Sequence, residues 1–536
     1  MKKNNIYKPI TVAISICIGI VMGSVIFGNS KPIFVTQNAN RYKLNRLIDI
    51  LENNYVDSIN TDSIIDLTVN NILDQLDPHS FYIPSSQQNL VQESMNGEFV
   101  GIGVTYFMLN DTLAVINPIK GGPSIKAGIK PGDRILFANG KQIYGKNLPT
   151  DSLMAVLKGE LNSDINLKVF RKSENKILNF KFKRNNVPVK SVDVAVLLNK
   201  NTGYIKVNRF AATTYTEFKV ALQSLKNQNA TEYIIDLRNN GGGYVEIADK
   251  MISEFLSEGQ TMVRLISKQG TEDKILVEKP GNFQQNKLYI LVDENSASAS
   301  EIFAGAIQDN DRGIIIGRRT YGKGLVQQDM ALGDGSSVRL TVSKYHTPSG
   351  RSIQKPYQLA DKEYDNDFQV RFNSGELFQK DSIKIIDSTS YKTISGRKIF
   401  EGNGGIIPDV FVPLPKNHIE TEIKLIMQSA FLSNFIFKII DKDRNTFESL
   451  SYTDLLNKVQ NQETYYIKFK NHLKSYPLNF NPDKYKKVIN QYITAEFINQ
   501  LISEDQAFKY LTPLDTEIAK ALEIQQNNKF DDILKP

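Results

Sequence analysis

The chain has 536 residues, of which 41% are hydrophobic and 23% are charged, proportions typical of a globular protein with several domains. Its 65 basic and 58 acidic side chains are interspersed, without the dense Lys/Arg blocks of nucleic-acid-binding proteins, so we expect no nucleic-acid partner. Cys17 is the single cysteine, which excludes disulfides and multi-thiolate metal sites within one chain.

An uncharged apolar segment lies near the N-terminus. Lys2, Lys3 and Lys8 precede the run PITVAISICIGIVMGSVIFGNS, residues 9–30, whose apolar part is close to the ~20 residues that cross a bilayer. We therefore predict a membrane anchor or signal segment over residues 1–30. The absence of a clear small-x-small cleavage site favours a single-pass anchor in a cell inner membrane, with everything after residue 30 exported to the periplasm. The alternative is a soluble periplasmic protein released by signal cleavage.

The next segment, residues 31–95, is predicted to be an N-terminal helical region. Its apolar residues recur at steps of three, four and seven between Leu47 and Leu76, a period that indicates amphipathic helices. Pro78 ends this pattern because proline is unable to continue a helix.

Residues 96–185 have a different texture, with short alternating strands, glycine turns and one short helix near SLMAVLKG. The following segment, residues 186–415, alternates apolar strands with helices, which predicts stacked βα units and a multidomain α/β protein. Within it, residues 355–403 form a polar insertion. Residues 416–536 are predicted to be a C-terminal helical region.

Two strands of the βα segment end in unusual loops. The first is EYIIDLRNNGGG, and the second is KLYILVDENSASASE, in which three serines alternate with alanines. Ser298 and Glu301 have the spacing of a helix capping box, which explains one serine without any chemistry. The other interpretation is an unhindered nucleophile.

A serine nucleophile needs a base, and histidine is scarce. The four histidines, His79, His346, His418 and His472, lie in the helical regions or after a strand, which disfavours a Ser-His-Asp triad. Lys323 lies between two glycines in RRTYGKGLVQQ, and a lysine can replace histidine if burial keeps its amine neutral. The free amides of the RNNGGG loop offer donors for a developing oxyanion.

Nucleotide binding is the competing interpretation of the lysine segment. GRRTYGK, residues 317–323, matches the start of a phosphate-binding P-loop, but Gly324 stands where the motif needs Ser or Thr. The residues that follow, LVQQDMAL, are typical of a strand and not of the required helix. We therefore expect no nucleotide, and chemistry between Ser298 and Lys323 would require no metal or other cofactor.

Several ordered motifs resemble those of the carboxyl-terminal processing peptidases, also called tail-specific proteases. They are GIGV, IIDLRNNGGG, ENSASASEIFAGAIQDNDRGIIIGRRTYGKGLVQ, KYHTPSGRSIQ and GGIIPDV, and the likeness extends over roughly residues 40–412. The resemblance implies a crotonase-like (ClpP/crotonase type) βα peptidase core, residues 186–415, with an inserted PDZ domain, residues 96–185.

The resemblance also implies a catalytic set. The nucleophile falls on Ser298, the general base on Lys323, and the glutamine that positions the amine of that lysine on Gln327. The amide of Ala299 falls on one position of the family's oxyanion hole.

The second oxyanion donor is left open by a difference from the family. The family motif reads DLRNNPGG, whereas this chain has Gly241 in place of the proline. Gly242 is the nearest match, but any of the three glycines at 241–243 remains a candidate.

The PDZ-like segment implies the substrate. Backbone amides of Gly101, Ile102, Gly103 and Val104 would bind the terminal carboxylate of a nonpolar tail. The resemblance thus implies a serine endopeptidase that cleaves exported proteins near their C-termini, with a homodimer or an adaptor lipoprotein as possible further partners. The alternative is a membrane-tethered PDZ scaffold with an inactive core, which the presence of Ser298, Lys323 and Gln327 disfavours.

Overall fold

The computed structural model describes residues 39–357, 364, 366–402, 404–415, 418–460, 463–474 and 480–536. The chain divides into two units, residues 1–72 and 73–536. The first unit contains α2 (Ala39–Asn54) and most of α3 (Thr61–Leu73), in agreement with the predicted N-terminal helices. The anchor predicted over residues 1–30 lies outside the described residues, so the anchor and the periplasmic placement stay predictions.

Over the described ranges, no single helix has the length and apolar character needed to span a bilayer. One bent pair, Thr421–Gln428 with Ala430–Lys442, passes this test only when its two helices are taken together, with a bend of 47°.

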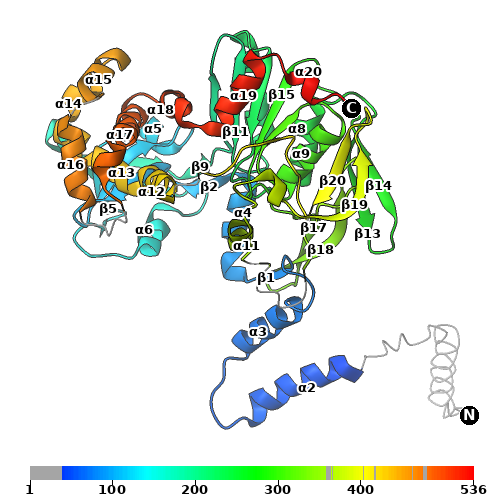
Figure 1. The fold of residues 1–536 in the computed structure, drawn as a ribbon. Helices are drawn as coiled ribbons and strands as arrows, with labels where there is room; N and C mark the ends of the chain where they lie inside the picture. The colour runs from blue at the N-terminus through cyan, green and yellow to red at the C-terminus, as the bar shows by residue number, and fades with distance from the viewer. Residues whose placement is uncertain are drawn as a thin grey trace, which may run out of the picture. The chain divides into compact units, whose positions relative to one another are not determined.

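A six-stranded sheet is the centre of the second unit (Figure 1). Its strands run in the order β10-β11-β12-β15-β16-β21, and all pairs are parallel except β10 with β11. The bounds are β10 (Val192–Leu197), β11 (Thr202–Val207), β12 (Glu232–Asp236), β15 (Lys287–Val292), β16 (Ile314–Gly317) and β21 (Val410–Phe411). The strands β12, β15 and β16 are almost continuously apolar, as expected for parallel strands that are covered on both faces.

Helices connect the parallel strands in βα units, as the sequence predicts. They are α7 (Thr214–Asn227), α8 (Val245–Ser253) and α9 (Ala299–Asp309). Every residue of α9 is buried, and its Phe303 packs edge-on against Phe255 with ring centroids 6.2 Å apart. This helix is therefore fixed in the interior, and Ser298 at its N-cap is held in a fixed position as well.

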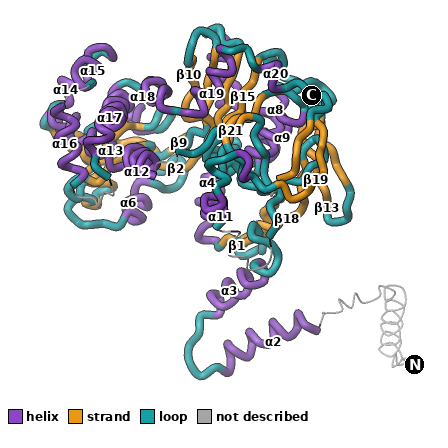
Figure 2. Tube along the Cα trace, in the orientation of Figure 1, coloured by secondary structure: helices purple, strands orange, loops and turns teal. Residues whose placement is uncertain are grey.

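A second sheet flanks this core and carries residues that face the site. It consists of β1 (Phe81–Ile83), β18 (Ser337–His346), β13 (Thr261–Ser267) and β14 (Glu272–Leu276), with β17 (Leu325–Ala331) also paired to β18. The strand β17 begins shortly after Lys323 and pairs with β18, which lies near β13 and β1 in Figure 2.

The predicted PDZ segment forms its own sheet and core. The strands are β3 (Val104–Met108), β4 (Leu113–Pro118), β5 (Asp133–Ala138), β6 (Lys141–Gln142), β7 (Asp164–Arg171) and β8 (Lys176–Lys183), with helices α5 (Pro123–Ala127) and α6 (Thr150–Leu157). A two-stranded ribbon of β2 (Glu98–Gly101) and β9 (Asn185–Pro188) joins the two ends of the segment. The helix α4 (Ser85–Asn96) precedes this ribbon.

The polar insertion is less solvated than its composition suggests. Its described parts include α11 (Asp367–Ser374), β19 (Ile385–Lys392) and β20 (Lys398–Gly402). Arg371 is 2% exposed and donates to the carbonyl oxygens of Arg319 and Thr320 at 3.0 and 2.7 Å. The insertion thus supports the segment that carries Lys323.

The C-terminal helices divide between two places. Those packed into one helical core are α12 (His418–Gln428), α13 (Ala430–Lys442), α14 (Arg444–Glu448), α15 (Tyr452–Val459), α16 (Glu463–Leu473), α17 (Lys486–Leu501) and α18 (Glu504–Leu511). The last two, α19 (Thr516–Gln526) and α20 (Phe530–Ile533), instead pack on the central sheet, where Phe530 contacts Tyr289 with ring centroids 5.3 Å apart.

Candidate active site

Three loops meet where parallel strands of the central sheet end. The glycine loop, residues 237–243, follows β12; the serine loop, residues 293–298, follows β15; and the lysine loop, residues 318–324, follows β16. Because the carboxyl ends of adjacent parallel strands lie at one sheet edge, these loops are neighbours. All residues predicted for the catalytic centre lie on or next to them.

Two of the three serines join the serine loop to the glycine loop. The hydroxyl of Ser296 donates to the carbonyl of Leu237 at 2.8 Å, and the hydroxyl of Ser300 donates to the carbonyl of Asn240 at 2.9 Å. Both side chains are completely buried. Their roles are therefore structural, and Ser298 is the one of the three with access to solvent.

Ser298 has an unusual backbone at the N-cap of α9. Its φ of 55° and ψ of −115° lie in a region that residues with a Cβ rarely adopt. Such local strain persists only where the surroundings hold it, and it presents the side chain at a tight turn between strand and helix. The predicted capping box with Glu301 is present in the structure.

The Glu301 carboxylate connects the serine loop to the lysine loop. Its Oε2 accepts the backbone amides of Ser298 and Lys323, each at 2.9 Å. Its Oε1 accepts the Thr320 hydroxyl at 2.5 Å and the Gly322 amide at 2.7 Å. Burial raises the pKa of Glu301, although these four donors act in the opposite direction.

Tyr345 makes a second connection between the same two loops. This tyrosine on β18 is 1% exposed, and its hydroxyl contacts the carbonyl oxygen of Ser298 at 3.0 Å and that of Lys323 at a shorter distance. Glu301 thus holds the amides of Ser298 and Lys323 while Tyr345 holds their carbonyls. The position of Ser298 relative to Lys323 is therefore fixed through the backbone amide and the backbone carbonyl of each residue.

The Lys323 amine lies in a partly buried environment. Burial, assisted by the nearby Arg339 guanidinium, lowers the pKa of Lys323 to about 8, although Glu301 and Asp77 act in the opposite direction. Within the described residues the amine forms no ion pair with a carboxylate. A Cβ on the adjacent Gly324 would lie 2.9 Å from Gln354 N, which explains why glycine stands beside the lysine.

The side chains of Ser298 and Lys323 are not hydrogen-bonded to each other in this structure. Catalytic hydrogen bonds commonly shorten only when substrate binds. Gln327, the predicted partner of the lysine amine, donates instead to the Thr341 hydroxyl at 3.2 Å. The structure therefore places Gln327 on the strand that follows Lys323 but does not join the two side chains.

The glycine loop lies directly against the serine. A Cβ on Gly242 would approach Ser298 Cβ and Ala297 O to 2.8 Å each. The Gly242 amide donates to Asn240 Oδ1 at 2.9 Å, whereas, within the part of the chain described, the Gly241 amide makes no hydrogen bond. The amide of Ala299, as the first residue of α9, also has no intrahelical partner.

Residues near the lysine that the sequence analysis did not assign to the site form a polar cluster. His79 contacts Tyr364 Oη through Nε2 at 2.6 Å, and Asp77 Oδ1 accepts the Thr341 hydroxyl at 3.1 Å. Burial and the charge of Lys323 lower the pKa of His79 to about 4. In the sequence, the neighbouring Pro78 predicts only the end of a helix, and no spacing links Asp77 or His79 to Lys323.

The predicted tail-binding residues, 101–104, run from the last residue of β2 to the first residue of β3. The carbonyl of Ile102 accepts from Ser124 N at 3.0 Å, and that of Gly103 accepts from Ile119 N at 2.9 Å. In a planar trans peptide, the N–H group points away from the C=O group of the same peptide bond. The amides of Gly103 and Val104 therefore face away from Ser124 and Ile119, which bind the carbonyls of Ile102 and Gly103. Ile102 itself is 2% exposed and belongs to the core of this segment.

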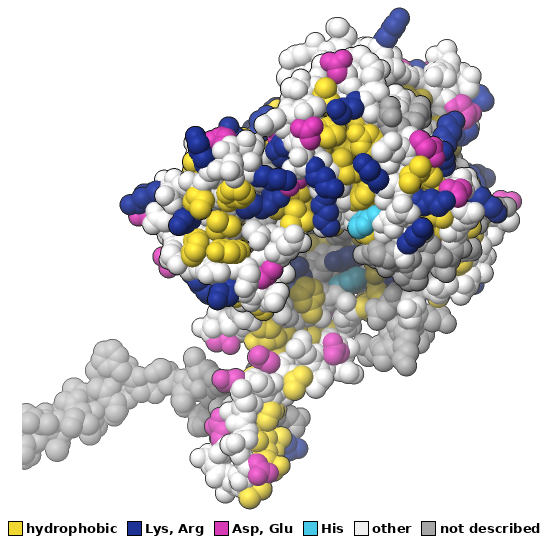
Figure 3. Space-filling model, turned by 90° about the vertical axis from the view of Figure 1, so that its left-hand side faces the viewer, with side chains coloured by type: hydrophobic (Ala, Val, Ile, Leu, Met, Phe, Trp, Pro, Cys, Tyr) yellow, Lys and Arg dark blue, Asp and Glu magenta, His cyan; other side chains and the backbone are white. Residues whose placement is uncertain are grey.

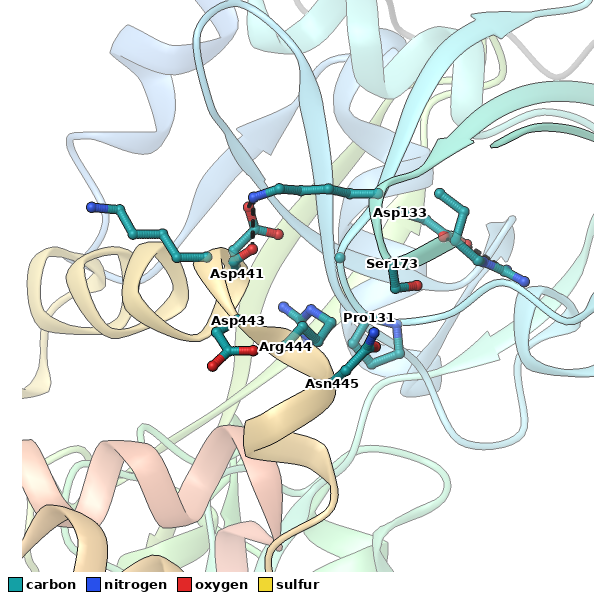
Figure 4. Close-up of a pocket in the computed structure, with 11 residues that line it drawn as sticks. Pro131, Asp133, Ser173, Asp441, Asp443, Arg444 and Asn445 are labelled. Atoms are coloured by element: carbon teal, nitrogen blue, oxygen red, sulfur yellow. Dashed lines mark hydrogen bonds and ion pairs between the residues drawn. The ribbon is translucent and has the colours of Figure 1, made fainter. Parts of the chain in front are cut away.

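One cavity of about 170 Å³ lies elsewhere, between the β-rich segment and α13–α14 (Figure 4). Four of its charged side chains form ion pairs, since Arg171 contacts Asp133 at 2.8 Å and Lys172 contacts Asp441 at 3.0 Å. None of the predicted site residues lines it.

Figure 3 shows the distribution of charged side chains on one face of the molecule. Basic side chains are spread over this face among acidic and apolar ones, with histidine beside a hollow (Figure 3). Among the residues described, no group of three or more His, Cys, Asp or Glu side chains is arranged to hold a metal ion.

Comparisons with known proteins agree with this arrangement. Residues 201–363 match the model of peptidase family S41, and residues 100–182 match that of a PDZ domain. Over 348 residues the chain is 34% identical to a probable CtpA-like serine protease of Staphylococcus aureus (strain N315), covering 64% of this chain and 68% of that protein.

Two further similarities are more distant. The carboxy-terminal processing protease CtpB of Bacillus subtilis (strain 168) is 29% identical over 352 residues, covering 64% of this chain and 71% of that protein. A solved photosystem II D1 C-terminal processing protease is 24% identical with a TM-score of 0.36, covering 70% of this chain and 88% of the other. The site, the family matches and the S. aureus relative together identify the chain as a serine-type peptidase of family S41 that carries a PDZ domain.

Proposed function

We propose that this chain is a serine endopeptidase that cleaves exported proteins near their C-termini, with Ser298 as nucleophile and Lys323 as general base. One observation carries the proposal: a single buried carboxylate, Glu301, binds the amides of both residues. The lysine amine has a lowered pKa and lacks a carboxylate partner in the described structure, as a base in a Ser-Lys dyad requires.

Acylation begins with the neutral Lys323 amine. It takes the proton of the Ser298 hydroxyl as Oγ attacks the scissile carbonyl carbon, and the carbonyl oxygen becomes an oxyanion. The intermediate collapses when the C–N bond breaks. The leaving amine takes the proton from the Lys323 ammonium, and the remaining acyl group is an ester of Ser298.

Deacylation uses the same base. A water molecule gives a proton to Lys323 as its oxygen attacks the ester carbon, and the second intermediate collapses with breakage of the bond to Ser298 Oγ. The proton on Lys323 returns to that oxygen. The products are a shortened protein with a new carboxylate and a released C-terminal fragment.

The oxyanion is stabilised by the Ala299 amide and by an amide of the glycine loop. The free Ala299 amide at the N-terminus of α9 supports the first assignment, because aligned backbone dipoles there favour negative charge. For the second donor, Gly242 must exchange Asn240 Oδ1 for the oxyanion, or the unpaired Gly241 amide must take its place. The close approach of Gly242 to Ser298 supports Gly242.

Substrate selection is assigned to the PDZ domain. The outward amides of Gly103 and Val104 would bind the terminal carboxylate, with Gly101 and Ile102 forming the turn, and β3 would pair with the tail. A crotonase-like core and a substrate-induced contact between Gln327 and Lys323 complete the proposal. The βα units and the placement of Gln327 on β17 support these last two points.

Removing either member of the dyad should abolish turnover. In Ser298→Ala and Lys323→Ala we expect kcat on a protein with an apolar tail to fall about 10⁴-fold or more, because acylation then lacks its nucleophile or its base. Lys344→Ala, an exposed lysine on β18, is the matched control and should retain activity. Retained cleavage in either dyad variant, with folding verified by circular dichroism, would contradict the mechanism and favour another site.

The glycine loop offers a paired test of the oxyanion assignment. Gly242→Ala should lower kcat strongly, by about 100-fold or more, because its Cβ would meet Ser298 and the φ of 100° is unfavourable for alanine. Gly241→Ala has open space around its Cβ and should retain most activity. Equal kcat values for the two variants would exclude Gly242 from the site.

Tail recognition is tested with peptides alone. A peptide with an apolar C-terminal sequence and a free carboxylate should bind the full-length Ser298→Ala protein at least about 10-fold more tightly than the same peptide with a C-terminal amide, because the amide loses the charge-assisted hydrogen bonds. Fluorescence anisotropy measures both affinities. Equal affinities would show that the carboxylate is not read by these backbone amides.

A further inference from the structure

The C-terminal helix α19 places a buried carboxylate beside the candidate active site. Its apolar residues Ile518, Ala521 and Ile524 pack on the central sheet, and its first turn contains Glu517. Figure 1 shows α19 next to β11 and β15, although more than 200 residues separate α19 from either strand in the sequence. The helix is therefore held at the sheet by apolar contacts that are independent of Glu517.

Glu517 joins two arginines that the sequence does not connect. Its Oε1 accepts from Arg318 Nη1 at 2.7 Å, and its Oε2 accepts from Arg238 Nη1 at 3.1 Å. The three side chains are 10%, 6% and 11% exposed, so these ion pairs are only weakly screened by solvent. Burial alone would raise the pKa of Glu517, but the two arginines lower it, which keeps the carboxylate charged.

The partners of Glu517 lie at the base of the three active-site loops. Arg238 is in the glycine loop, and Arg318 begins the lysine loop. The Arg318 Nε also donates to Glu294 in the serine loop at 2.6 Å. A single carboxylate from the end of the chain thus links the loops that carry the proposed oxyanion donor, nucleophile and base.

We propose that Glu517 is a positioning residue for the peptidase, which holds the glycine, serine and lysine loops in register through Arg238 and Arg318. The inference rests on the Ser298–Lys323 chemistry proposed above. Glu517 touches neither substrate nor the reacting atoms. If Glu517 holds the loops in this way, the C-terminal segment belongs to the catalytic module, and docking of α19 on the central sheet is required for full activity.

The substitution Glu517→Gln tests this role with little change of shape. The glutamine offers one acceptor oxygen where two arginines donate, and its NH₂ group faces a guanidinium. In the full chain we expect kcat to fall about 10- to 100-fold, because small displacements of catalytic groups cost that much. The affinity for an apolar-tail peptide should stay unchanged. Glu523→Gln, an exposed glutamate on the same helix, is the control and should behave like the wild type.

Hydrogen exchange supplies a readout that does not depend on the dyad. Peptides that cover residues 238–243 and 318–324 should exchange faster in Glu517→Gln than in Glu523→Gln. Assays run well below the melting temperature of each variant separate positioning from global unfolding. An unchanged kcat, a loss that vanishes at low temperature, or unchanged exchange in both loops would overturn the inference. Failure of the dyad itself would be recognised separately, by an active Ser298→Ala protein.

Discussion

The site depends on one buried carboxylate that holds two chain segments by their backbones. Glu301 accepts the amides of Ser298 and Lys323 on the same oxygen, and Thr320 and Gly322 satisfy the other. A buried charge is tolerated only when it is fully hydrogen-bonded, so the carboxylate and the loop geometry require each other. Tyr345 adds the carbonyl half of the same connection. The strained backbone of Ser298 persists because the hydrogen bonds of Glu301 and Tyr345 hold both loops at several points.

Function has a cost in stability at this site. Keeping an amine neutral near physiological pH means burying it, and burial of Lys323 is the main cause of its lowered pKa. Arg238, Arg318 and Glu517 are also nearly removed from water, and their charges are compensated by ion pairs with one another. The C-terminal helices therefore differ in role, because α19 completes the core while α12–α18 build a separate helical core.

Much of the site could be predicted from local motifs. Ser298, Lys323 and the glycine loop each follow a strand of the central sheet, and the adjacent parallel pairing of these strands in the structure brings the loops to one sheet edge. Side-chain contacts between residues far apart in the sequence could not be predicted, because no sequence spacing links Tyr345, His79 or Glu517 to the loops. The polar composition of residues 355–403 also gave a wrong impression, because it suggests a solvated segment whereas Arg371 within it is buried. The direct contact of Gln327 with Lys323 stays a prediction.

The most direct test is a titration of the Lys323 amine itself, by NMR of the Ser298→Ala protein with ¹³C-labelled lysine and with Lys323→Arg to assign the signal. The account predicts a pKa of about 8, well below the ~10.4 of a free lysine. Because only the neutral amine accepts the serine proton, kcat/KM of the active protein should rise with pH and level off above that pKa. A Lys323 signal that titrates at its ordinary value, with kcat/KM already level at neutral pH, would contradict the account.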